Sequence, residues 1–177
     1  MTVKSYRPFD REKAIEVIKF VAKNAPNPDI YWVGKILYFA DLLHLQKYGR
    51  VICGDDYVAM QYGTVPSGTY DLLKQARIFA QMPEFHPAIG EFEIQGKNKV
   101  VPLRKPDCEV FSESDIECLM ASIKEYGHLS FSELHKRSMD KAFQSADPNG
   151  IIDIEQIIGM LPNGKALLQD IRDSCAL

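Results

Sequence analysis

The sequence lacks paired cysteines and long apolar runs, and both absences narrow the class of protein. Its four cysteines are scattered, without the close pairs that zinc sites and redox motifs need: Cys53, Cys108, Cys118 and Cys175. The longest apolar-rich stretch, residues 30–45, is interrupted by Lys35, Asp41 and His44. The first residues lack the apolar core and small-residue cleavage site of a secretion signal. We therefore expect free thiols, a cytoplasmic location and no membrane-spanning segment.

The motifs of common enzymes, cofactor sites and metal sites are missing as well. The sequence contains no Gly-rich phosphate loop, no Gly-x-Ser-x-Gly elbow, no His-Glu-x-x-His and no kinase signature. The four histidines have no paired spacing: His44, His86, His128 and His135. The sequence therefore predicts neither a cofactor nor a bound metal ion.

An excess of positive charge is missing too. The formal net charge of -3 argues against a protein that mainly neutralises nucleic-acid phosphates or an anionic membrane. Residues 129–138 are compatible with the first helix of a helix-turn-helix, but no basic recognition helix follows. After Lys141 come Phe143, Gln144, Asp147 and Pro148. We do not expect nucleic acid as a partner.

What is present is the composition of one globular domain. The 177 residues are 46% hydrophobic and 25% charged, and no repeat, low-complexity tract or linker divides them. We therefore expect a single domain over residues 1–177.

Helix caps and turn residues predict a mainly α fold with a small β element. They favour helices over residues 10–24, 29–48, 67–79, 112–127 and 153–161, and further helices that begin at Ser130 and Asn163. Residues 57–60 are β-prone, and residues 92–103 have the pattern of a β-hairpin. The helix over 29–48 is apolar on nearly all sides, so the others should cover it. The expected fold has about six to seven helices around this central helix.

Polar residues on the central helix are the first candidates for chemistry, because each needs a partner once it leaves water. Asp41 and His44 are three residues apart and share a helix face. We favour a structural role, in which they bind one another and Arg50 to fix the turn after the helix. A partner-binding role is the second possibility. The third is a small hydrolase or transferase, with Ser67 or Cys53 as nucleophile. For Lys35, we expect the charge to reach solvent along the edge of the core.

A series of segments carries a family resemblance. The run Lys35-Ile-Leu-Tyr-Phe-Ala-Asp-Leu-Leu-His44 is followed by Tyr48-Gly-Arg50, Gly54-Asp55, Tyr57-Val-Ala-Met60 and Tyr62-Gly-Thr-Val-Pro-Ser67. In this order and spacing they resemble the Panacea domain of SocA-like antitoxins. Further matching segments are Tyr70-Asp-Leu-Leu-Lys74, Phe111-Ser-Glu-Ser-Asp-Ile-Glu-Cys-Leu119 and 126–134. The resemblance covers most of the chain, from about residue 15 to residue 158.

The resemblance implies a mainly helical protein that binds and neutralises a cognate toxin protein, without cofactor or catalysis. One branch of the family delivers its toxin to a cytosolic protease, which makes a protease a second implied partner. The apolar end Ser174-Cys-Ala-Leu177 is a candidate for protease recognition. Some members resemble phage-associated proteins, so a repurposed phage or defence interaction module is the alternative function.

We expect the region from Lys35 to Pro66 to form or support the toxin-binding surface. The candidate protein-binding or motif residues are Lys35, Tyr38, Asp41, His44, Tyr48, Arg50, Asp55, Tyr62, Pro66, Ser138 and Asp140.

Two segments depart from the family pattern. The family usually has Ser-His-Asp followed shortly by Trp, where this chain has Ser138-Met-Asp140 and then Phe143, and Tyr62-Gly-Thr replaces the customary Tyr-Gly-Pro. If the missing His or Trp contributes to a partner surface, the partner class here differs. A buried Trp-to-Phe change would only adjust packing.

Overall fold

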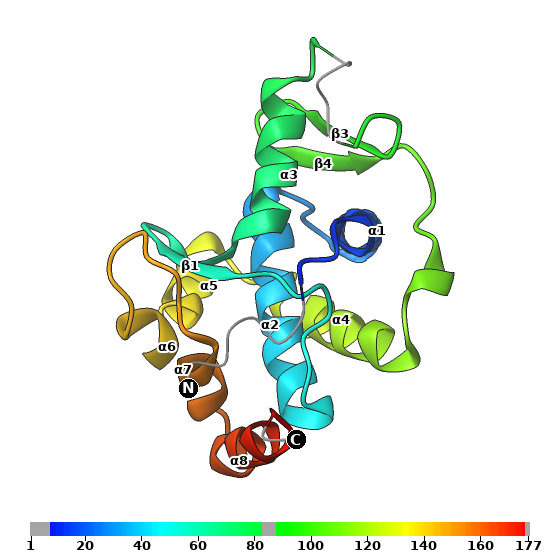
Figure 1. Cartoon of the computed structure of the whole chain (residues 1–177). Coiled ribbons are helices and arrows are strands. Elements are labelled where there is room, and N and C mark those ends of the chain that lie inside the picture. Colours follow the sequence, from blue (N-terminus) through cyan, green and yellow to red (C-terminus); the bar gives the residue numbers. More distant parts are fainter. Residues whose placement is uncertain (1–7, 83–87, 176–177) are drawn as a thin grey trace.

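The computed structural model describes residues 8–82 and 88–175, and these residues form a mainly α-helical fold with two small antiparallel sheets (Figure 1). In chain order the helices are α1 (Arg11–Asn24), α2 (Ile30–Tyr48), α3 (Ser67–Ile78), α4 (Glu113–Tyr126), α5 (Phe131–Ser138), α6 (Lys141–Gln144), α7 (Ile154–Gly159) and α8 (Gly164–Cys175). A 3-10 turn, η2 (Cys108–Val110), precedes α4. The strands are β1 (Tyr57–Met60), β2 (Gly63–Pro66), β3 (Phe92–Gln95) and β4 (Lys99–Pro102), paired as the hairpins β1–β2 and β3–β4.

The helix ends confirm the predicted caps. The side chains of Asp10 and Asp29 accept hydrogen bonds from backbone N–H groups in the first turns of α1 and α2. Helix α2 ends at Gly49, whose φ of 67° lies in the left-handed region that glycine adopts without strain. Reciprocal capping boxes begin α4 at Ser112 and α5 at Ser130.

Two elements were not predicted from the sequence. Strand β2 pairs antiparallel with β1, with Tyr57 opposite Pro66, so residues 57–66 form a hairpin rather than a single β-prone segment. Helix α6 has four residues and begins at the cap Asp140. It is too short to show a helical period in the sequence, and it adds one helix to the seven that the caps indicate. The hairpin over 92–103 is confirmed as β3–β4.

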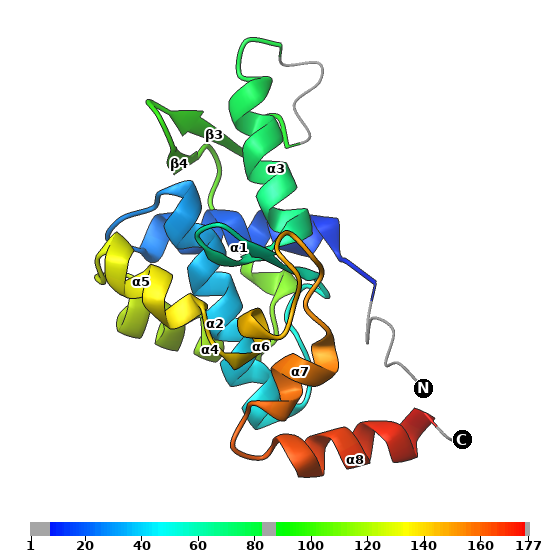
Figure 2. The ribbon, with the colours of Figure 1, turned by 90° about the vertical axis from the view of Figure 1, so that its left-hand side faces the viewer.

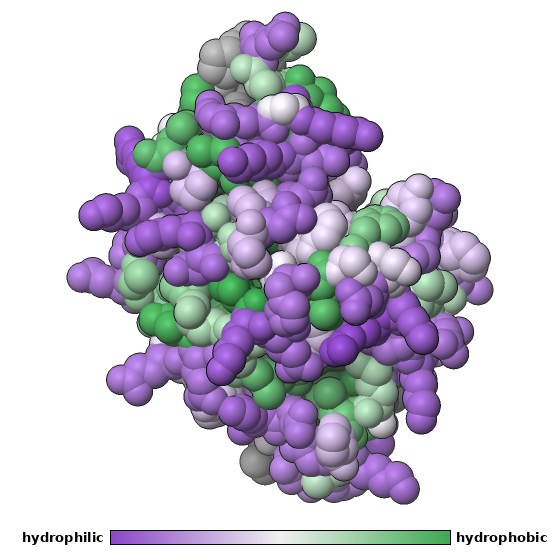
Figure 3. Space-filling view, turned by 180° about the vertical axis from the view of Figure 1, so that it is seen from behind, coloured by the Kyte–Doolittle hydropathy of each residue, from purple (hydrophilic) through white to green (hydrophobic). Residues whose placement is uncertain are grey.

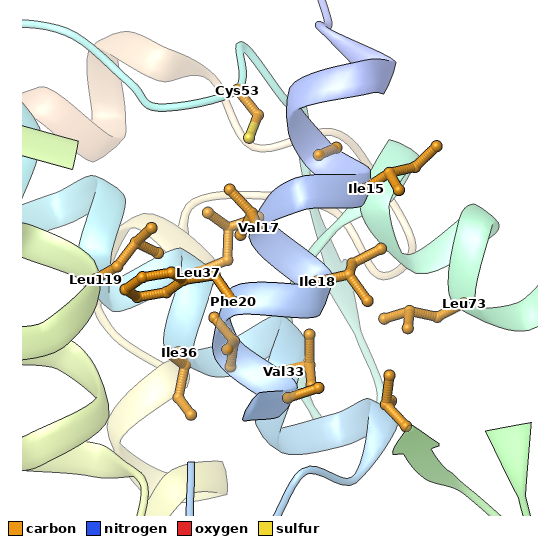
Figure 4. Packing of buried hydrophobic residues seen from close by; sticks show 14 of the residues in the cluster. Ile15, Val17, Ile18, Phe20, Val33, Ile36, Leu37, Cys53, Leu73 and Leu119 are labelled. Carbon is orange, nitrogen blue, oxygen red and sulfur yellow. The ribbon is translucent and has the colours of Figure 1, made fainter. Parts of the chain in front are cut away.

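Helix α2 is central, as its apolar circumference predicts. It packs against α1, α3, α4, α7 and β2 (Figure 1, Figure 2). One cluster of buried apolar residues lies between α2, α1, α3 and α4, where their side chains point toward one another (Figure 4). A second cluster joins α2 to β1 and to helices α5, α6, α7 and α8. Both clusters include residues of α2, so this helix connects them.

The surface combines hydrophilic and hydrophobic side chains. The face in Figure 3 is covered mostly by hydrophilic side chains, with smaller hydrophobic areas between them. No helix in residues 8–82 and 88–175 is long and apolar enough to cross a membrane.

Candidate functional site

Asp41 lies buried on α2 and binds the chain that follows this helix. Its carboxylate accepts hydrogen bonds from the Ile52 backbone N–H, at 2.7 Å, and from the Tyr57 hydroxyl. Burial raises the pKa of Asp41 to about 6, although both hydrogen bonds act in the opposite direction. Asp41 therefore fixes the loop after α2 and the start of β1.

His44 is also buried on α2, and it binds a different set of groups. Its Nδ1 lies 2.9 Å from the Arg50 carbonyl oxygen, and its Nε2 lies 3.0 Å from Ser114 Oγ and 3.2 Å from Asp115 Oδ1. Asp115, fully buried in the first turn of α4, also contacts Lys13 Nζ at 2.7 Å and Arg50 Nη2 at 3.0 Å. Burial alone would raise the pKa of Asp115, but hydrogen bonds from His44 and Lys13 hold it well below its usual range. This cluster joins α1, α2 and α4.

The prediction that Asp41 and His44 bind one another is wrong. Each has its own partners, and of the two only His44 contacts the predicted neighbour Arg50. In the described part of the chain, neither side chain is hydrogen-bonded to Ser67 or Cys53, and both are 1% exposed or less. The base of a hydrolase built on this pair would be buried, and neither predicted nucleophile would lie within its reach; the hydroxyl that His44 contacts is that of Ser114.

Three other predicted site residues lie outside the hydrogen-bonded groups of Asp41 and His44. Asp55 caps α3 by accepting from the backbone N–H groups of Gly68 and Thr69, at 2.7 and 2.8 Å, and burial raises its pKa. Pro66 is buried at the start of α3. Tyr48 is exposed at the end of α2, and its hydroxyl donates to Glu117 at 2.5 Å.

A second buried polar cluster contains four of the predicted residues: Lys35, Tyr38, Ser138 and Asp140. Lys35 Nζ donates to the Thr64 carbonyl oxygen at 2.6 Å, and Thr64 Oγ1 donates to the Ser138 carbonyl oxygen at 2.9 Å. The Tyr38 hydroxyl donates to Asp140 Oδ2 at 2.5 Å. These bonds join α2, β2 and the α5–α6 connection.

The prediction that the charge of Lys35 reaches solvent is also wrong. The side chain is 1% exposed, and Nζ lies inside the protein, 5.0 Å from the centre of the Tyr31 ring. Burial lowers the pKa of Lys35 to about 7, and the negative charge of Asp140 opposes this shift only in part. The cause is the position of β2 over α2, which the sequence did not reveal.

A partly exposed group of aromatic rings lies beside this buried cluster, and we define Tyr31, Tyr62, Phe131 and His135 as the aromatic patch. Ring centroids are 4.6 Å apart for Tyr31 and Phe131, and 5.5 Å apart for Tyr62 and Phe131. Tyr62 is 50% and Phe131 41% exposed. His135 contacts both rings, and its buried Nε2 has no hydrogen-bond partner within the described residues.

Only Tyr62 of the patch was a predicted site residue. Tyr31, Phe131 and His135 are not among the candidate residues that the sequence indicates. Their spacing of four residues places the last two on one face of α5, but nothing in the sequence indicates that this face meets Tyr62.

A shallow groove of about 370 Å³ lies between the β1–β2 turn and the segment after α6. It is lined by Ala59, Met60, Gln61, Phe143, Gln144, Ala146, Pro148 and Asn149. Among the residues that depart from the family pattern, Phe143 is in the groove wall and Met139 is an exposed residue at the end of α5.

The structure offers no cation site among residues 8–82 and 88–175, since no group of three or more His, Cys, Asp or Glu side chains could hold a metal ion. His86 and the last two residues of the segment 174–177 lie outside the described residues. Helix α6 has only four residues, too few for the recognition helix of a helix-turn-helix.

Fold and site together define a mainly helical domain whose central polar side chains join its own elements and whose exposed aromatic rings gather on one side. Residues 33–143 match the family described as antitoxin SocA-like, Panacea domain. This match spans more than half of the chain, and the protein belongs to that family. Comparisons with curated proteins and with solved structures gave no match.

Proposed function

We propose that this protein is a cytoplasmic antitoxin that neutralises a partner toxin by direct complex formation and not by catalysis. The observation that carries the proposal is the family match over residues 33–143. The site is compatible with it, because Asp41 and His44 are buried and bound to structural partners. An exposed group of Tyr and Phe rings is the kind of surface that anchors protein partners.

Co-expression with the products of neighbouring genes tests the proposal. We expect one neighbouring product to arrest growth when expressed alone, and to be harmless and to co-purify in a stoichiometric complex when this protein is present. The control is the same toxic product with an empty vector. A neighbouring product that stays fully toxic and does not co-purify would count against the proposal.

The fate of the toxin separates two versions of this function. In simple sequestration, the half-life of the toxin in cells is unchanged by the antitoxin. In the protease-adaptor version that the family resemblance implies, the antitoxin shortens it. Pulse-chase measurement with and without this protein, in the same co-expression strain, distinguishes the two.

A repurposed phage or defence interaction module is the second candidate, and the positions of Met139 and Phe143 favour it. Both depart from the family pattern and lie at the exposed end of α5 and in the groove wall. A partner that co-purifies in a stable complex but does not arrest growth on its own would support this candidate over the antitoxin.

A further inference from the structure

The aromatic patch is built from three segments that are far apart in the sequence. Tyr31 belongs to the first turn of α2, Tyr62 to the β1–β2 turn, and Phe131 and His135 to α5. The β1–β2 hairpin, α5 and α6 lie on the same side of the molecule (Figure 1, Figure 2). The patch is therefore a property of the folded chain and exists only when these segments are assembled.

Buried bonds hold the three segments in place beneath the patch. Lys35 of α2 binds Thr64 of β2, and Thr64 binds the backbone of Ser138 at the end of α5. The Tyr31 hydroxyl donates to the Tyr62 carbonyl oxygen at 3.1 Å. Because these bonds already order the segments, a partner that docks on the patch loses little free energy to ordering them.

The charged side chains of α5 and α6 differ in whether they already have partners within the protein. Lys136 of α5 and Lys141 of α6 are exposed, and neither forms an ion pair with any residue that the structure describes. The neighbouring carboxylates are engaged: Glu133 binds Ser130 in the capping box, and Asp140 caps α6 and binds Tyr38. On α5 and α6, the charges that no ion pair or cap engages are therefore positive, in a chain whose net charge is -3.

We propose that the aromatic patch is the surface that holds the toxin, and that the toxin presents there an apolar side chain flanked by carboxylates. This inference rests on the proposed antitoxin function. Aromatic rings at the centre of an interface supply most of its binding energy, and complementary charges at the edge steer association.

Binding kinetics of purified variants with the toxin found by co-expression test the inference. We expect Tyr62→Ala and Phe131→Ala each to weaken the complex about 30-fold, mainly through faster dissociation. The double variant Lys136→Glu/Lys141→Glu should associate about 10-fold more slowly, and its association rate should depend less on salt.

Matched controls come from α4. Met120→Ala removes another exposed apolar side chain, and Lys124→Glu reverses another exposed lysine, so both should bind within about threefold of the wild type. Thermal melting checks the fold of every variant first. Tyr62→Ala keeps the backbone oxygen that Tyr31 binds, so it remains a valid test if Phe131→Ala proves unstable.

The outcomes separate this inference from the proposed function. Wild-type protein that neutralises its toxin, with Tyr62→Ala and Phe131→Ala binding equally well, would overturn the inference and leave the function intact. Wild-type protein that neither binds nor neutralises a neighbouring product would overturn both. Unchanged association of the charge-reversed double variant would overturn the acidic character of the partner.

A single-stranded oligonucleotide is the competing ligand for a surface of aromatic rings and lysines. The two available lysines and the negative net charge favour the protein partner. Oligonucleotide binding by the wild type that the double variant abolishes, without loss of toxin binding, would overturn the inference.

Discussion

At the residue scale, Lys35 is the side chain whose surroundings differ most from water. Its ammonium group has one hydrogen bond, to the Thr64 carbonyl oxygen, and no carboxylate within ion-pair distance among the described residues. Burial lowers its pKa to about 7, with partial opposition from Asp140. Neutral and charged forms are therefore both populated near neutral pH in the folded protein.

Lys35→Met should flatten the pH dependence of stability. Unfolded Lys35 keeps its proton up to a pKa of about 10.4, whereas the folded protein releases it above a pKa of about 7. The unfolded state therefore binds more protons between pH 7 and 9, and stability rises with pH in this window. The free energy of unfolding of the wild type should increase by about 2 kcal/mol more than that of the variant.

Urea denaturation at pH 7 and pH 9 measures this difference. Lys124→Met, which changes an exposed lysine of α4, serves as the control. If Lys35→Met and the wild type gain the same free energy between the two pH values, the lowered pKa is not a property of the folded protein.

The buried polar clusters show that a sequence can indicate which side chains need a partner without indicating the partner. Asp41 and His44, on a helix that is apolar on nearly all sides, must find partners, and this was predictable, whereas the burial of Lys35 was not. Their partners were not predictable, because His44 contacts Asp115 and Ser114, and the nearer of these two residues is 70 positions further along the sequence. Asp115 belongs to the capping box that begins α4, which is a local pattern and says nothing about Lys13 or Arg50.

At the scale of elements, the β1–β2 hairpin shows how tightly the chain is packed over α2. Gly63 has a φ of 95°, in the left-handed region. A Cβ atom there would lie 2.1 Å from Ser138 Oγ and 3.0 Å from Lys35 Nζ. Strand β2 escaped prediction because it is four residues long and bounded by Gly63 and Pro66, which are signals of a turn.

Gly63→Ala should destabilise the protein far more than Gly96→Ala. Both glycines lie in hairpins with positive φ, at 95° and 58°, but a Cβ at Gly96 has nothing within 4 Å. Gly96→Ala should cost about 1 kcal/mol for the left-handed backbone. Gly63→Ala adds a clash and should cost about 3 kcal/mol. Equal losses in urea denaturation would show that Ser138 and Lys35 do not confine this turn.

At the scale of the whole molecule, α2 connects the two buried clusters. Its apolar circumference predicted the central position, and the local signals predicted where seven of the helices begin. The aromatic patch could not be predicted in the same way. It needs the first turn of α2, the β1–β2 turn and α5 to meet, and a single sequence carries no signal for contacts between segments so far apart.

The shared helix leads to a prediction about cooperativity. We propose that the chain is a single domain, because Trp32, the only tryptophan, packs against both clusters. Urea unfolding followed by Trp32 fluorescence and by far-UV circular dichroism should then give one coincident transition. A cavity in either cluster should shift the whole transition, since neither cluster can unfold without exposing α2.

Ile18→Ala in the first cluster and Ile157→Ala in the second are the matched variants, since both side chains are 1% exposed or less. Each should lower the free energy of unfolding by about 3 kcal/mol, with both probes still coincident. Ile151→Ala, at a position 67% exposed, should stay within about 0.5 kcal/mol of the wild type. Two separate transitions, or a variant that shifts one probe and not the other, would mean that the clusters unfold independently and that α2 does not couple them.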